Sequence, residues 1–113
     1  MQELIGKLET ALAALGCPLY ANTTDSLGEC AVYKFHTATN NGSRKEINLQ
    51  LYIRAESMAR GLLLEEAADR AVVPLGERPV TSGVTGAARN GGGNMEDGDR
   101  HIRIAYYNVV ARA

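Results

Sequence analysis

A run of strict alternation in the middle of the chain sets the strongest constraint on its fold. Aliphatic residues stand at every second position from 47 to 53, and polar residues fill the positions between them. Because successive side chains of a strand point to opposite faces, the pattern predicts a strand with one face on a core. The apolar row is Ile47, Leu49, Leu51 and Ile53, and the polar row is Asn48, Gln50 and Tyr52.

The residues before this strand predict a β-hairpin. Residues 30–37 read as its first strand, and an Asn-Gly turn signal follows them. A two-residue turn would place Phe35 opposite Asn48 and turn one apolar row to the wrong side. A three-residue loop, Asn40–Gly42, places Phe35 opposite Ile47 and brings both apolar rows onto one face. An odd loop is therefore predicted, with a glycine at its left-handed position.

Two helices are predicted on either side of this hairpin. The first spans residues 3–15, where leucines recur with helical spacing at Leu4, Leu8, Leu12 and Leu15. The second spans residues 57–73, with Ser57 as its N-cap. Its inner stripe is Gly61, Leu64, Ala68, Ala71, Val72 and Leu75. Its carboxylates Glu65, Glu66 and Asp69 are interpreted as a solvated outer face.

The C-terminal part predicts two further strands, residues 79–87 and 101–111. Between them, residues 88–99 are rich in glycine and charge and are interpreted as a mobile surface loop. A short edge strand near Leu19–Ala21 is a further option. The predicted fold is α+β in the order α-β-β-α-β-β. Two helices pack on one face of a mostly antiparallel four-stranded sheet, in a single domain of residues 1–113.

Charge and composition exclude several function classes. Twelve basic and thirteen acidic residues leave a net charge of −1, which is no electrostatic footprint for nucleic acid or an anionic membrane. No apolar run approaches the ~20 residues that a membrane-spanning helix needs, and no targeting segment is visible. We expect a protein made in a cytoplasm, with no membrane partner and with Cys17 and Cys30 as reduced thiols.

No residue pattern predicts an active site. The run Gly91–Gly93 fits neither a phosphate-binding loop nor a dinucleotide fingerprint, and the acidic residues after it miss the calcium-loop spacing. His36 and His101 have no Cys, His or carboxylate partners at the spacing of a zinc site. We expect no enzyme activity and no catalytic, cofactor-binding or metal site.

The polar residues instead predict an assembly interface. A polar sheet face is expected to combine Asn48, Gln50, Tyr52 and Arg54 with Arg103 and Tyr107, a mixture that suits a protein–protein surface. A plain solvated face is equally compatible with the composition. Charges in and beside residues 88–99 are expected to pair across a protein–protein interface once that loop becomes ordered: Arg89, Glu96, Asp97, Asp99 and Arg100.

The layout of the chain resembles a family of phage proteins. The resemblance lies in "CAVYKF", in "NLQLYIRAESMARGLLLEEAADRAV" and in "NMEDGDRHIRIAYYNVVAR", and it covers nearly the whole chain. It is to the tail-terminator proteins of long-tailed bacteriophages, also called minor capsid or tail-completion proteins.

The resemblance implies a structural protein of the virion, located at the head–tail junction. Such proteins form rings, usually hexameric, that cap the tail tube, end its polymerisation and offer a docking surface to the head connector. DNA would pass through without specific binding, which a near-neutral wall favours. Two alternatives stay open: another head–tail joining or connector component, and a small α+β accessory or ligand-binding domain.

Overall fold

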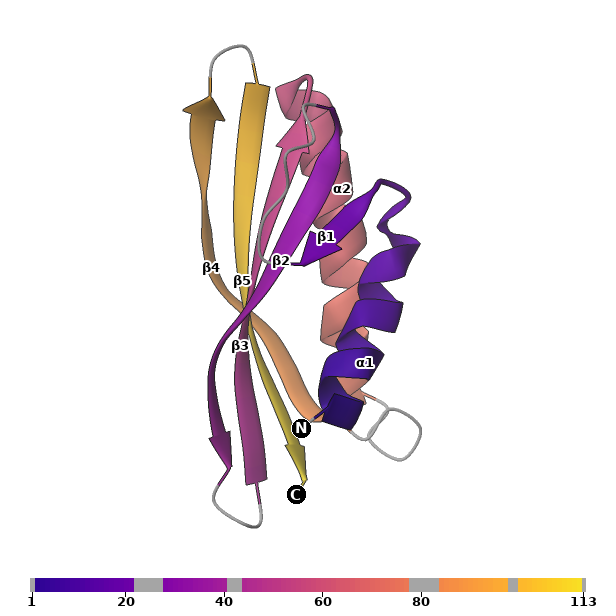
Figure 1. The fold of residues 1–113 in the computed structure, drawn as a ribbon, viewed down its shortest axis with the longest axis vertical. Coiled ribbons are helices and arrows are strands. Elements are labelled where there is room, and N and C mark those ends of the chain that lie inside the picture. Colours follow the sequence, from indigo (N-terminus) through magenta and orange to yellow (C-terminus); the bar gives the residue numbers. More distant parts are fainter. Residues whose placement is uncertain (1, 22–27, 41–43, 78–83, 98–99, 113) are drawn as a thin grey trace.

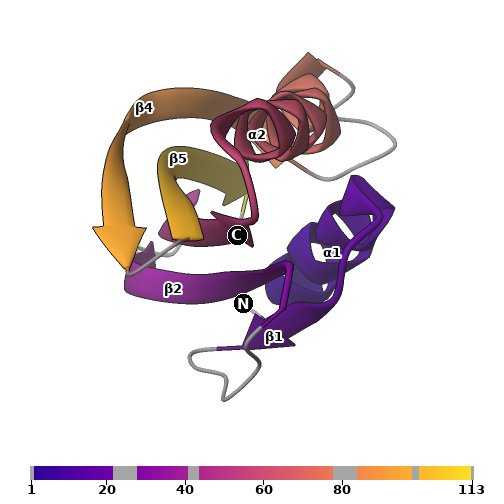
Figure 2. The same cartoon turned by 90° about the horizontal axis from the view of Figure 1, so that it is seen from above.

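The computed structural model describes residues 2–21, 28–40, 44–77, 84–97 and 100–112. The chain is elongated, with extents of 45 × 22 × 21 Å, and both helices lie on one side of a twisted sheet (Figures 1 and 2). The elements are α1 (Gln2–Leu12), the 3₁₀ turn η1 (Ala13–Leu15), β1 (Leu19–Ala21), β2 (Cys30–Asn40), β3 (Arg44–Ala55), α2 (Met58–Val72), the 3₁₀ turn η2 (Val73–Glu77), β4 (Val84–Asp97) and β5 (Arg100–Arg112).

Among the described residues the sheet has five strands in the order β1-β2-β3-β5-β4, so the predicted four-stranded, mostly antiparallel sheet and the element order α-β-β-α-β-β are wrong. The additional strand is β1, which runs parallel to β2, whereas the other neighbours are antiparallel. The Ala31 amide donates to the Pro18 carbonyl at 2.8 Å, which sets the chain alongside β2 directly after the first helix. A parallel neighbour becomes available because η1 and the left-handed Gly16, at φ 83°, reverse the chain there.

The β2–β3 hairpin has its apolar rows on one face, as predicted, but in a different register. Phe35 pairs with Leu49, two residues further along than predicted, and Asn40 pairs with Lys45. The predicted pairing of Phe35 with Ile47 is therefore wrong, and so is the predicted loop start, because Asn40 belongs to β2. Residues 41–43, which include the predicted loop glycine, lie outside the described residues, so the odd loop stays a prediction. A β-bulge directly after His36 supplies the one-residue shift that keeps both apolar rows on the helix side.

Residues 88–97 belong to strand β4, so the prediction of a mobile loop there is wrong. The whole strand from Val84 to Asp97 pairs with β5, with irregularities next to Gly86 and between Arg89 and Gly91. The long β5 offers a free edge whose backbone groups pair with a glycine-rich segment of low intrinsic strand preference. The first half of the strand predicted over 79–87 lies outside the described residues.

The core fills the space between the helices and the sheet. All four leucines of the first helical segment are buried, as their spacing predicted. On α2 the buried residues are Gly61, Leu64, Ala68 and Val72, and the Ser57 hydroxyl caps the helix by accepting from the Arg60 amide at 3.1 Å. The sheet contributes chiefly Leu49, Leu51, Ile53, Tyr107 and Val109.

Candidate assembly surfaces

The polar row of β3 lies on the outer face of the sheet, away from the helices. Asn48, Gln50, Tyr52 and Arg54 alternate with fully buried aliphatic residues and are all partly exposed. Across the strand boundary, Tyr52 pairs with Ile104 and Gln50 pairs with Tyr106. The outer face is therefore mixed, because polar residues of β3 stand beside apolar residues of β5.

Arg103 and Tyr107 do not belong to this outer face, and the prediction that placed them there is wrong. Tyr107 pairs with Leu49 and is fully buried on the helix side. The inward row of β5 continues through Val109, whereas the row of Ile104 runs into Asn108. The longer uninterrupted apolar row takes the core, because it buries more apolar surface.

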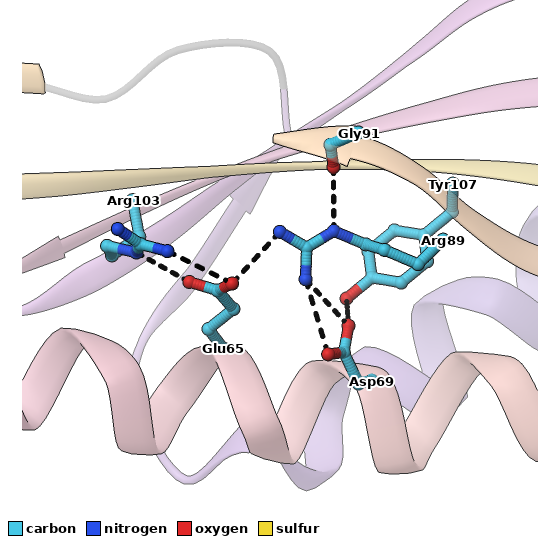
Figure 3. Close-up of polar contacts among 6 residues, drawn as sticks. All are labelled: Glu65, Asp69, Arg89, Gly91, Arg103 and Tyr107. Carbon is cyan, nitrogen blue, oxygen red and sulfur yellow. Dashed lines mark hydrogen bonds and ion pairs between the residues drawn. The ribbon is translucent and has the colours of Figure 1, made fainter. Parts of the chain in front are cut away.

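Arg103, Tyr107 and Arg89 instead meet two carboxylates of α2 (Figure 3). Glu65 accepts from Arg103 Nε at 2.5 Å and from Arg89 Nη2 at 2.9 Å. Asp69 accepts from Arg89 Nη1 at 3.1 Å and from the Tyr107 hydroxyl at 2.6 Å. The interpretation of Glu65 and Asp69 as a solvated helix face is therefore wrong. We call these five residues the ionic cluster.

The carboxylates of the ionic cluster pair with its arginines. The two arginines, with Arg103 bonded most strongly, hold the pKa of the Glu65 carboxyl below its usual range. Burial and the hydrogen bond to Asp69 raise the pKa of the Tyr107 hydroxyl well above its ordinary value. The cluster joins α2 to β4 and β5, and its side chains make these polar contacts within the chain.

Two glycines of β4 adjoin Arg89 of this cluster. A Cβ atom on Gly92 would lie 2.4 Å from Arg89 Nη2 and 2.5 Å from the Ile104 carbonyl oxygen. Gly91 has φ 154°, which L side chains rarely adopt, and its carbonyl accepts from Arg89 Nε at 2.7 Å. The glycine run that suggested a flexible loop is thus in part a packing requirement of the arginine.

The remaining predicted interface residues lie at the far end of the β4–β5 hairpin. Glu96 and Asp97 are in β4, paired through their backbones with His101 and Arg100. Asp99 lies outside the described residues. The charges predicted to act in one interface therefore lie in two places. Arg89 belongs to the ionic cluster, whereas Glu96, Asp97 and Arg100 lie at the far end of the hairpin.

The structure also presents apolar residues that the sequence reasoning did not select. Met58, Leu62 and Leu63 of α2 are 47%, 41% and 55% exposed, and Met95 of β4 is 47% exposed. On the outer face a hollow of about 300 Å³ is lined by Asn48, Leu49, Gln50, Asn90 and Tyr106. The sequence did contain a signal for the exposed leucines of α2, because three consecutive leucines, residues 62–64, cannot all face one core.

Neither a metal centre nor a membrane span is found in the described part of the chain. No three His, Cys, Asp or Glu side chains among these residues lie close enough together to hold a metal ion. Neither described helix is long and apolar enough to cross a bilayer.

Comparison with known proteins gives a structural match only. No protein-family model matches the chain, and no curated protein matches it. Among solved structures it is similar to a chain from the virion of a native gene transfer agent particle, with a TM-score of 0.60 and 12% identity. The likeness covers 97% of this chain and 92% of that chain. At this identity it shows a shared fold, and the tail-terminator assignment stays a prediction.

Proposed function

We propose that this chain is a structural protein of a phage-like virion and acts as a tail terminator. The observation that carries the proposal is the fold likeness to a virion chain, which extends over 97% of one chain and 92% of the other. A match over both full lengths argues for a whole shared subunit rather than a common motif. The sequence resemblance to tail terminators points in the same direction.

In this proposal the subunits form a ring, hexameric as is usual in that family, that caps the tail tube. The ring stops addition of further tube subunits and presents a surface to the head connector, and DNA passes through without specific binding. Met58, Leu62 and Leu63 are exposed within two turns of α2, which supports an assembling protein because grouped exposed apolar residues often mark interaction sites.

The proposal includes no enzyme activity. Within the ionic cluster, each carboxylate is bonded to an arginine. A role in binding and assembly uses the surfaces that these pairs leave open. The outer face, with its amides Asn48 and Gln50, suits contact with protein or passage of DNA without retention.

The test is deletion of the gene from the particle-producing genome, with electron microscopy of the products. A tail terminator predicts overlong tails that carry no heads, and supply of the chain in trans should restore normal length. Headless tails of normal length would instead support the alternative of another head–tail joining component. Normal particles in the absence of the chain would refute both functions.

A further inference from the structure

An asparagine followed by a glycine stands at the bulge of β4. Arg89 and Gly91 both have partners in β5, but the register shifts between them, and Asn90 is the extra residue at this shift. A bulge residue is left unpaired, and the hydrogen-bond ladder is disrupted locally around it. The peptide bond that joins Asn90 to Gly91 therefore lies at an irregular point of the strand.

The backbone itself favours a glycine after Asn90. Gly91 has φ 154°, a conformation that residues with a side chain rarely adopt. Its carbonyl oxygen accepts from Arg89 Nε at 2.7 Å (Figure 3). Because glycine has no Cβ atom, the backbone nitrogen of Gly91 can be approached more closely than that of any other residue.

The Asn90 side chain is open to water. It is exposed, and it lines the hollow of about 300 Å³ on the outer face together with Asn48, Gln50 and Tyr106. The hollow leaves room for the carboxamide to turn back toward its own backbone and for water to reach it. The described residues that line the hollow carry no charge.

We propose that Asn90 is a site of spontaneous deamidation and isoaspartate formation. The backbone nitrogen of Gly91 gives up its proton to water and attacks the side-chain carbonyl carbon of Asn90. The bond from that carbon to the amide nitrogen breaks, ammonia leaves, and a succinimide ring remains. Water then opens one of the two ring C–N bonds, which yields aspartate or isoaspartate. Water is the only co-reactant, and the reaction does not depend on the proposed function.

The bulge is also a place where the product can be accommodated. Isoaspartate runs the main chain through the former side chain and adds one carbon atom to it. Within a regular ladder such an insertion would disturb the pairs around it, whereas at Asn90 the register already shifts. The new carboxylate changes the formal net charge from −1 to −2 and introduces a charge among the uncharged residues of the hollow.

Asn94 of the same strand provides a matched comparison within the wild-type chain. It is exposed, as Asn90 is, but it pairs regularly with Arg103 and is followed by Met95, whose side chain hinders attack by the backbone nitrogen. We expect Asn90 to react at least about tenfold faster than Asn94, the ratio that a barrier difference of about 1.4 kcal/mol gives.

The experiment incubates the purified full chain in mildly alkaline buffer and samples it over several weeks. A protease that cleaves after glutamate releases the segment between Glu77 and Glu96, which contains both Asn90 and Asn94. The other Asn-Gly pair, residues 41–42, falls in a different peptide. Tandem mass spectrometry locates the mass gain of about one dalton and distinguishes isoaspartate from aspartate.

Two variants and an unfolded reference complete the experiment. Asn90→Gln removes the site without a change of charge, and Asn94→Gln is its matched control; circular dichroism establishes that both fold. The same incubation in urea gives the rate for the unfolded chain. Should either variant fail to fold, the comparison of Asn90 with Asn94 in the wild type still decides the outcome.

The mass gain should appear at Asn90 in the wild type and in Asn94→Gln, and the peptide from Asn90→Gln should lack it. The folded rate should lie within about tenfold of the rate in urea, since the bulge leaves the site free to react. Three results would overturn the inference: equal rates at Asn90 and Asn94, a folded rate lower than this range because the strand protects the site, or a mass gain that persists in the Asn90→Gln peptide.

Discussion

Replacement of Gly92 by alanine tests whether the glycine run is a packing requirement. The added Cβ would lie 2.4 Å from Arg89 Nη2 and 2.5 Å from the Ile104 carbonyl oxygen, both far inside van der Waals contact. The arginine can move only by giving up bonds to the α2 carboxylates, and the carbonyl can move only by displacing β5. Overpacking of this kind costs about 1–3 kcal/mol.

The matched control is Gly93→Ala, one residue further along the same strand. Its Cβ would meet nothing within 4 Å, and we expect its free energy of unfolding to change by no more than about 0.5 kcal/mol. Both variants should be measured at the same protein concentration, because assembly would alter apparent stability. In urea unfolding, a loss of about 2 kcal/mol lowers the midpoint by about 1 M when the slope is about 2 kcal/mol per M.

Equal midpoints for the two alanine variants would refute the packing argument. A double-mutant cycle identifies the partner that causes the cost. Arg89→Met removes the guanidinium, and Gly92→Ala should then cost less than it does beside the arginine. If its cost is unchanged, the Ile104 carbonyl alone opposes the Cβ atom, and the proposed link between Gly92 and the ionic cluster is wrong.

Three further predictions concern the polar contacts between the helices and the sheet. Tyr107→Phe removes a 2.6 Å bond to Asp69 and should lower the free energy of unfolding by about 1.5–3 kcal/mol, measured in urea; an unchanged value would argue against a formed bond. The pKa of Glu65 is depressed in the folded chain, so its stabilisation is complete above its unfolded value of about 4.3 and is lost as pH falls through the lower folded value. Glu65→Gln should therefore flatten the fall of the thermal midpoint in that acid range, and parallel curves would contradict this. The hydrogen bond to Glu9 and burial raise the pKa of Tyr33 to about 12, so Tyr33→Phe should remove the matching step from an ultraviolet titration of the phenols.

Sequence spacing predicted the elements whose pattern is local. The leucines of α1 and the alternation of β3 each repeat with one period along a single segment, and both bury the predicted rows. The cap of α2 at Ser57 was predicted for the same reason, since its bond to the Arg60 amide spans only three residues.

The candidate interface was predicted less well, because its residues depend on pairing between distant strands. Both rows of β5 contain apolar residues, so alternation alone did not decide which row faces the helices. The placement of Tyr107 opposite Leu49 decided it, and this turned Arg103 inward to Glu65, a residue 38 positions away.

By itself, the sequence determined two amphipathic helices and a two-faced central hairpin, because local periodicity fixes which side of an element is apolar. Only the tertiary structure decided that a glycine-rich segment becomes an edge strand and that four charges become a closed cluster. The physical reason is that a strand forms where a neighbouring edge supplies its hydrogen bonds. Likewise, whether a carboxylate or an arginine is exposed or partly buried depends on whether the fold places an oppositely charged partner beside it.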